Sequence, residues 1–426
     1  MDLDNRTTQP NHINEGSWKT KTALFLSSQG LSLFGSMLVQ YAIIWYVTLT
    51  TQSGIFLTLS TLVSFLPQIV ISLFAGVWAD RYPRKLLIIF ADLLIALSTL
   101  GLAIAFLLGY RELWLLFLVS AIRSVGGGIQ MPAVNALLPQ IVPQDRLIKV
   151  NSINGTIQPF IMIAAPLVSG GLMSFAMLES IFFIDVVTAM LAVGLLLALK
   201  VPVHEKAAQA RIGGYFDDLK AGLGYIQATP VIKSLFVFYA AVFFLATPAI
   251  FLTPLLVTRS FGDDVWRLTA NEVTFFVGSI IGGVIMTIWG GFKNHFRTIG
   301  LACILWAVLF AGLGLSRDFI LYLVIMFLAG IPMPMFSVPA TTLLQQIVKP
   351  DMQGRVFGVN QLITTTVLPA GMIIFGPIAD VITVEALLVI ASTAMGIPAL
   401  WIFFNRRFNQ AVRAMASSDY KLQPGD

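Results

Sequence analysis

Residues 76–85 read Gly-Val-Trp-Ala-Asp-Arg-Tyr-Pro-Arg-Lys and form a dense cluster of charges between two long apolar runs. One apolar run ends at Gly76, and the next begins near Leu86. Charges of both signs in so short a connection are typical of a tight cytoplasmic turn between two membrane helices. We therefore expect residues 54–78 and 86–108 to cross a membrane and the charged turn between them to lie in the cytoplasm.

The composition of the whole chain agrees with that interpretation. Of its 426 residues, 57% are hydrophobic and only 11% are charged. A soluble protein of this size and composition would expose far more apolar surface than water tolerates. The sequence therefore predicts an all-α integral membrane protein.

The sequence argues against several kinds of functional site. Cys303 is the only cysteine, so no intrachain disulfide can form, and three scattered histidines are too few for a metal site. The loops contain no phosphate-binding motif, no paired carboxylates and no nucleophile with a positioned base. The net charge of +5 comes from basic residues beside the apolar segments, where they indicate orientation and not nucleic-acid binding. We predict no enzymatic activity, metal, cofactor or nucleic-acid partner.

Twelve apolar segments are long enough to cross a membrane at roughly 20 residues a crossing. Residues 201–229 form the one long, charged connection and separate six segments from six. Within it, residues 215–226 could form an amphipathic helix at the membrane surface or a plain loop. The predicted segments are 22–49, 54–78, 86–108, 113–140, 147–175, 180–199, 232–258, 271–291, 297–315, 319–347, 355–380 and 385–404.

An internal repeat relates the two sets of six segments. Residues 135–154 (NALLPQIVPQDRLIKVNSIN) match residues 341–360 (TTLLQQIVKPDMQGRVFGVN) with Gln, Asp and Asn in register as well as aliphatic residues. The offset spans an even number of segments, so we expect parallel repeats. The expected organisation is an N-terminal tail, a six-helix half, a cytoplasmic linker, a second six-helix half and a C-terminal tail, at 1–21, 22–200, 201–230, 231–405 and 406–426.

The basic residues predict the orientation of the chain in the membrane. If the N-terminus is inside, the outer loops hold only Arg111, Arg259, Arg267 and Arg317, and Arg123 lies within a segment. The cytoplasmic side then takes the other 21 of the 26 Lys and Arg residues. This asymmetry predicts that both termini are cytoplasmic. The polar first 20 residues contain no apolar core of a signal peptide, so we expect no cleavage there.

These features resemble the major facilitator superfamily, whose loop between helices 2 and 3 carries Gly-x-x-x-Asp-Arg/Lys-x-Gly-Arg-Arg/Lys. Residues 76–85 match that motif, except that Pro83 stands in place of its second Gly. Residues 165–171 resemble a degenerate antiporter motif, which favours export. The resemblance implies twelve helices in two parallel six-helix repeats. Five further stretches resemble the drug-antiporter branch that contains bacterial macrolide efflux proteins: 91–96, 122–124, 132–136, 184–186 and 354–357.

In this family the charged loop forms a cytoplasmic latch that holds the two halves together while the transporter is open outward. By position, the latch falls on Gly76, Asp80, Arg81, Arg84 and Lys85. The N-terminus of the eleventh helix, near Gly354, would stabilise Asp80 by about 0.3–1 kcal/mol. Alternatively, the loop only anchors the topology. The repeat copy at residues 290–297 lacks the acid, so we expect the latch in one half only.

Three charged residues lie inside predicted segments, where an ionised group costs about 2.5–3.5 kcal/mol. Arg123 resembles the family's helix 4 arginine, which is implicated in proton transfer, but it could also pair structurally with a carboxylate or carbonyl. Asp92 and Asp185 are candidates for proton coupling or for structural hydrogen bonding, and their different depths argue against a direct pair. Glu272 is a further proton-coupling candidate, although residues 269–272 (TANE) also spell a helix-capping box.

The resemblance implies that helices 1, 4, 7 and 10 line a central cavity. Amides, aromatic rings and methionines on these helices suit bulky amphipathic compounds, and they equally suit helix packing. The candidate substrate-binding residues are Gln29, Ser36, Gln40, Gln130, Met131, Tyr239, Phe243, Phe244, Met333, Phe336 and Ser337.

Because no ATP site is present in the sequence, we expect an ion gradient to supply the energy. The resulting hypothesis is proton-coupled export of amphipathic, macrolide-like drugs by alternating access. The partners would be the substrate, protons and membrane lipids, and the protein would be a monomer in the bacterial cell membrane. The alternatives are an exporter of a natural metabolite, such as a siderophore or lysolipid, and a membrane sensor that binds ligand without moving it.

Overall fold

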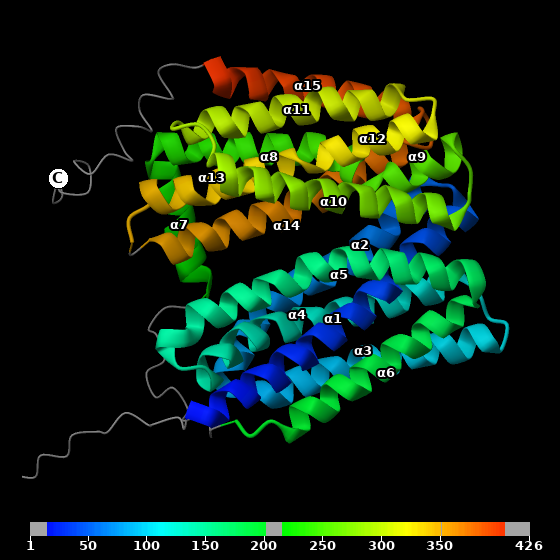
Figure 1. Cartoon of the computed structure of the whole chain (residues 1–426), viewed down its shortest axis with the longest axis vertical. Coiled ribbons are helices and arrows are strands. Elements are labelled where there is room, and N and C mark those ends of the chain that lie inside the picture. Colours follow the sequence, from blue (N-terminus) through cyan, green and yellow to red (C-terminus); the bar gives the residue numbers. More distant parts are fainter. Residues whose placement is uncertain (1–14, 202–214, 351, 405–426) are drawn as a thin grey trace, which may run out of the picture.

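The computed structural model describes residues 15–201, 215–350 and 352–404, which form helices joined by short turns, with no strand (Figure 1). Twelve stretches of these residues are long and apolar enough to cross a membrane. They coincide one to one with the twelve predicted segments, so the predicted all-helical membrane fold is confirmed. The first helix begins at Glu15, inside the predicted tail, because a helix can continue beyond the apolar length that a membrane requires.

The first half of the chain forms six long helices, which lie together in the lower part of Figure 1. The closest neighbours are α2 with α4, α1 with α6 and α3 with α4. The six helices are α1 (Glu15–Thr51), α2 (Gly54–Arg81), α3 (Arg84–Leu107), α4 (Leu113–Ile141), α5 (Leu147–Phe175) and α6 (Leu178–Ala198).

The second half forms the upper group in Figure 1, and two of its six spans are interrupted. Pro254 lies in the first turn of α9 and Pro332 begins α13, and proline cannot donate the backbone hydrogen bond that a continuous helix needs. The helices are α8 (Pro230–Phe251), α9 (Thr253–Ser260), α10 (Val265–Trp289), α11 (His295–Leu315), α12 (Phe319–Gly330), α13 (Pro332–Ile347), α14 (Gln353–Ile378) and α15 (Val384–Phe404).

The connection between the halves contains a helix, α7 (Tyr215–Ala228), where the sequence left a helix and a loop open. This helix packs on α14. Gly222 approaches α14 so closely that a Cβ atom built on it would lie 2.9 Å from the carbonyl oxygen of Arg355. The Tyr225 hydroxyl also accepts a hydrogen bond from the backbone N–H of Lys349 at 3.4 Å. The described helix of the linker, α7, is therefore anchored to the second half.

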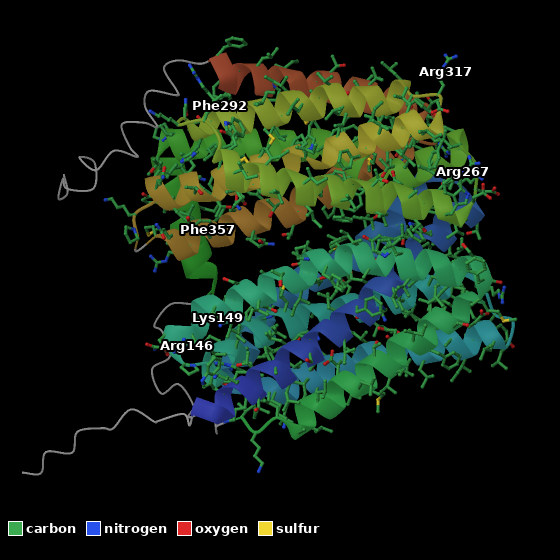
Figure 2. The ribbon with its side chains drawn as sticks, viewed as in Figure 1. Arg146, Lys149, Arg267, Phe292, Arg317 and Phe357 are labelled. Atoms are coloured by element: carbon green, nitrogen blue, oxygen red, sulfur yellow. The ribbon has the colours of Figure 1, made fainter. Side chains whose placement is uncertain are left out.

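The molecule has two ends, which we name by the course of α1. At the terminal end α1 begins and α6 ends, and at the distal end α1 ends and α2 begins. Figure 2 shows Arg146 and Lys149 toward the terminal end of the first half and Arg267 and Arg317 toward the distal end of the second half.

Glycines mark where the two halves touch. A Cβ atom on Gly54 would lie 2.0 Å from the carbonyl oxygen of Gly376, and one on Gly170 would lie 1.8 Å from Thr269 Oγ1. These contacts join α2 to α14 and α5 to α10 at the distal end. At the terminal ends of α2, α5 and α14, Cβ atoms on the following glycines would meet no described atom within 4 Å: Gly76, Gly155 and Gly354. The halves therefore meet at the distal end, and in Figure 1 the two groups of helices diverge toward the terminal end.

A cluster of polar groups, which we call the distal lock, also joins the halves at the distal end. Asp380, just after α14, accepts hydrogen bonds from the backbone N–H groups of Gly54 at 2.7 Å and Ile55 at 3.0 Å. It also accepts one from Ser53 Oγ at 2.7 Å. These donors form the N-terminus of α2, so a carboxylate of the second half caps a helix of the first half.

Arg259, at the end of α9, completes the distal lock. Its guanidinium donates to Asp380 Oδ1 at 2.8 Å and to the carbonyl oxygen of Ala379 at 2.6 Å. It also donates to the carbonyl oxygen of Gln52, at 3.0 Å from Nε. Gln52 has a φ of 46°, in the left-handed region that residues other than glycine rarely adopt. A disfavoured turn between α1 and α2 is thus held by a side chain from the other half.

Candidate functional site

A cavity of about 400 Å³ lies within the first half, and every residue that lines it comes from α1 to α5. Six predicted site residues contribute to its wall: Gln29, Ser36, Gln40, Arg123, Gln130 and Met131. The other polar lining residues were not predicted, and they are Ser64, Gln68, Ser120, Ser124, Asn135, Asn154 and Gln158. The apolar lining consists of Leu33, Met37, Ile95, Val134 and Ile157, with Gly127 between them.

Helical spacing brings the predicted residues of α1 and α4 to the cavity. Gln29, Ser36 and Gln40 are separated by seven and four positions, which places them on one face of α1. Arg123, Gly127 and Gln130 are separated by four and three positions, which places them on one face of α4, and all of them line the cavity. The polar stripes read from the sequence therefore do face a common space.

Glycines let α4 approach its neighbours closely around this cavity. A Cβ atom on Gly128 would lie 2.8 Å from the carbonyl oxygen of Gln68 on α2, and one on Gly126 would lie 2.6 Å from the Ile95 side chain on α3. The Ser124 hydroxyl oxygen accepts a hydrogen bond from the backbone N–H of Gln68 at 2.9 Å. This close packing fixes the position of the α4 side chains relative to α2 and α3.

Arg123 forms a buried ion pair at one side of the cavity. Its Nη1 lies 2.5 Å from Asp185 Oδ2, with side-chain exposures of 9% for Arg123 and 1% for Asp185. Nη1 also donates to Thr99 Oγ1, and Nη2 donates to the carbonyl oxygen of Ser36 at 3.2 Å. The positive charge of Arg123 is therefore compensated within the protein. This pairing with a carboxylate is the structural alternative that the sequence left open.

Asp92 occupies a different position, with no cation among its described contacts. Its side chain is fully buried, and Oδ1 accepts hydrogen bonds from Ser32 Oγ and Gln130 Nε2, both at 2.7 Å. Oδ2 is buried and has no hydrogen-bond partner among the described residues. A carboxylate without a counter-charge costs far more free energy in such surroundings than a neutral carboxyl group does. Gln130 connects this group to the cavity because its side chain also lines the wall.

Glu272 lies in the second half and is not among the residues that line the cavity. The expected capping box is wrong, because α10 already begins at Val265 and Asp264 is its N-cap residue. Glu272 Oε1 accepts a hydrogen bond from Asn271 Nδ2 at 3.3 Å, and Tyr322 Oη donates to Asn271 Oδ1 at 2.7 Å. The predicted segment begins at residue 271, and its apolar pattern does not indicate that α10 begins six residues earlier, at Val265.

Three of the four aromatic candidates of the second half pack together, and none of the four lines the cavity. Tyr239 and Phe336 are 2% and 4% exposed, and their ring centroids lie 5.4 Å apart. Phe243 also packs on Phe336, at 5.5 Å, and Phe244 packs on Phe375 of α14 at 5.2 Å. The remaining two candidates, Met333 and Ser337, lie on the exposed face of α13.

The charged loop after α2 is short and tied to its own half. Only Tyr82 and Pro83 separate α2 from α3. Arg84 donates to the carbonyl oxygens of Ala79 at 3.1 Å and Ala136 at 2.7 Å. Lys85 Nζ donates to two carbonyl oxygens at the end of α6, Leu197 and Leu199. The side chain of Asp80, the expected acid of the latch, lies outside the described part of the structure. Gly76 lies at the separated terminal end, and the Arg81 side chain is exposed.

Comparison with known proteins relates the chain to membrane transporters. The family model for the Major Facilitator Superfamily matches residues 25–372. Macrolide efflux protein A of Streptococcus pyogenes is 28% identical over 381 residues, which cover 88% of this chain and 94% of that protein. Macrolide efflux protein A of Enterococcus faecalis is 28% identical over 316 residues, which cover 73% and 97%.

Solved structures show the same fold at low sequence identity. A POT family transporter in complex with 5-aminolevulinic acid has a TM-score of 0.71 at 10% identity, over 92% of this chain and 96% of that chain. The nucleoside transporter NupG has a TM-score of 0.62 at 17% identity, over 93% of this chain and 98% of that chain. These similarities concern the arrangement of the helices and not the bound compound.

Proposed function

Since the chain belongs to the major facilitator superfamily, we propose that it is a secondary active transporter that exports amphipathic, macrolide-like compounds in exchange for protons. The observation that carries this proposal is the buried carboxyl group of Asp92, which shares Gln130 with the wall of the cavity. Similarity to two macrolide efflux proteins supports the compound class.

The proton-carrying role of Asp92 is argued from its contacts. A proton on Oδ2 would leave both hydrogen bonds to Oδ1 intact, so the neutral carboxyl group would keep its contacts with Ser32 and Gln130. Loss of the proton creates an uncompensated charge that would be stabilised by water entering through the cavity or by movement of a cation toward it. A compound bound at Gln130 would compete for the amide that holds Asp92. Binding and proton release are thereby linked at one side chain.

Arg123 and Asp185 are proposed to support coupling as a pair. Asp185 compensates Arg123, and Thr99 and the Ser36 carbonyl hold the guanidinium in place beside the cavity. Movement of α1 or α4 would alter these contacts. We assign Glu272 a secondary role, because it lies in the half that contributes nothing to this cavity.

We further propose that the observed conformation is open toward the cytoplasm. The distal lock and the glycine contacts close one end, and the excess of Lys and Arg at the other end predicts that this end faces the cytoplasm. Residues 76–85 would act as the latch at that end in the opposite conformation. The protein would work as a monomer, surrounded by lipid, in the bacterial cell membrane with both termini in the cytoplasm.

The gradient sets how strongly a compound can be driven out. One pH unit supplies about 1.4 kcal/mol for each proton. Exchange of a proton for a neutral compound also uses the membrane potential, at about 2.3 kcal/mol per 100 mV, whereas exchange for a monocation does not. Neutral compounds are therefore expected to be concentrated more strongly.

The test measures compound-driven proton flux in proteoliposomes containing the purified protein. We expect a macrolide gradient to drive proton movement in the wild type, and Asp92→Asn to abolish that movement while retaining exchange of labelled for unlabelled macrolide. Asp145→Asn is the matched control, because Asp145 is exposed and should behave like the wild type. Proton flux that survives in Asp92→Asn would show that Asp92 is not the proton carrier. Binding without any flux in the wild type would support a sensor, and flux with siderophores or lysolipids but not macrolides would support a metabolite exporter.

A further inference from the structure

Seven residues with side-chain amides line the cavity in the first half. We propose that this cavity is a subsite for the uncharged, oxygen-rich part of the exported compound, such as a glycosyl or polyol group, while the apolar part of the compound lies outside it. The inference rests on the proposed export function and names the chemistry that its binding site selects. The amides are Gln29, Gln40, Gln68, Gln130, Asn135, Asn154 and Gln158.

Most of these amides have hydrogen-bonding groups that the protein does not use. Gln130 is bound to Asp92, and Gln29 makes one long contact of 3.4 Å to Ser28 Oγ. The side chains of the other five make no hydrogen bond to any described residue: Gln40, Gln68, Asn135, Asn154 and Gln158. Each carboxamide offers two donors and one acceptor. Hydroxyl, ether and carbonyl oxygens of a ligand are the groups that match such a surface.

The charge of the lining favours an uncharged ligand group. Among the described residues, Arg123 is the only charged one that lines the cavity, and Asp185 compensates it at 2.5 Å. Asp92 is fully buried behind Ser32 and Gln130, so it offers no surface to a ligand cation. A charged ligand group would thus lose its hydration without finding a free counter-ion on this wall. Hydroxyl groups lose less, because amides replace the hydrogen bonds that water made.

The size and apolar lining indicate that only part of a bulky compound is held here. A volume of about 400 Å³ lies at the lower end of the range for ligand pockets. Leu33, Met37 and Ile157 give the wall apolar strips between the amides, which suits the carbon faces of a sugar ring. Met131 is 54% exposed and can contact an apolar group beyond the cavity.

Gln68 is the most informative position for a test. Its side chain lies beside the open surface of Gly127, where a Cβ atom would be 3.7 Å from Gln68 Oε1. It makes no hydrogen bond to a described residue, so Gln68→Leu removes ligand-binding groups without breaking a contact within the described structure. Gln345→Leu in α13 is the matched control, since its side-chain amide is likewise unbonded to described residues but lies in the other half and outside the cavity.

The experiment compares a glycosylated macrolide with its sugar-free macrolactone by equilibrium binding to the purified full-length protein. We expect the wild type to bind the glycoside at least about tenfold more tightly. Gln68→Leu should reduce glycoside affinity by about that factor and leave macrolactone affinity unchanged, which also reports that the variant is folded. Gln345→Leu should alter neither affinity.

Two results would overturn the subsite. One is equal affinity of the wild type for the glycoside and the macrolactone. The other is an equal loss of both affinities in Gln68→Leu with the fold retained, as judged by an unchanged thermal unfolding midpoint. Proton flux driven by the macrolactone would show that export operates even if the subsite proposal fails, because export can persist when the sugar contributes nothing to binding. Absence of flux with both compounds would count against the export mechanism itself.

Discussion

At the scale of single residues, Arg123 and Asp185 form a buried ion pair, so the effect of substituting one residue should depend on the other. Asp185→Asn would leave the Arg123 charge uncompensated, and we expect a loss of about 3–5 kcal/mol in stability. Arg123→Gln in the same chain removes that charge, so the double variant should be more stable than Asp185→Asn alone. Thermal unfolding of the four proteins in detergent measures this coupling. Strictly additive effects would show that the two residues do not interact.

Gly35 lies where α1 and α6 pack so closely that a larger side chain does not fit. A Cβ atom there would lie 2.1 Å from Thr188 Oγ1 and 2.8 Å from Asp185 Oδ1, between α1 and α6. We expect Gly35→Ala to destabilise the protein by about 1–3 kcal/mol through overpacking. Gly101→Ala in α3 is the control, because a Cβ atom there would meet no described atom within 4 Å. Equal unfolding midpoints for the two variants would contradict the packing argument.

At the scale of helices, the distal lock depends on the charge of Asp380. Burial raises the pKa of Asp380, but hydrogen bonds from Gly54, Ser53, Ile55 and Arg259 outweigh that effect and hold the pKa below its ordinary value. A carboxyl group with a lowered pKa stabilises the folded contact above its unfolded pKa and loses that effect as pH falls through the folded value. The distal lock should therefore persist throughout the neutral range and down to roughly pH 4.

Asp380→Asn tests the distal lock. The substitution removes the charged acceptor of Arg259 and of the α2 N-terminus, so we expect spin labels on α2 and α9 to show a larger population of long distances. Asp318→Asn is the matched control, because Asp318 caps α12 at the same end but within one half, with Oδ1 2.8 Å from the Leu321 N–H. Identical distance distributions in the wild type and Asp380→Asn would show that the distal lock does not affect the conformational equilibrium.

At the scale of the whole molecule, the two ends should stabilise opposite conformations. The distal lock closes one end here, and the proposed latch at residues 76–85 would close the terminal end when the distal end opens. We expect Asp80→Asn to lower the population of the distally open conformation without preventing folding. Distances across the terminal end, measured by spin labels on α2 and α14, check this expectation. Unchanged populations would mean that the loop only anchors the topology.

The sequence predicted the positions of the spans well and the contacts between them poorly. The α1 and α4 stripes pointed to one wall of the cavity, and Gln29, Gln40 and Gln130 do line it. Gln68 and Gln158 were overlooked, although an amide inside an apolar segment is itself a signal. Tyr239 and Phe336 were candidates for the same surface, but they pack inside the second half.

By itself, the sequence determined the class of protein, the number of spans and the family, because hydropathy, charge and local motifs are properties of short segments. Only the tertiary structure decided that Arg123 pairs with Asp185, that Gln130 joins Asp92 to the cavity, and that Asp380 caps α2. The physical reason is that a helix in lipid is apolar on its outer face as well as its packed face. Its sequence pattern therefore does not specify which neighbour each side chain meets.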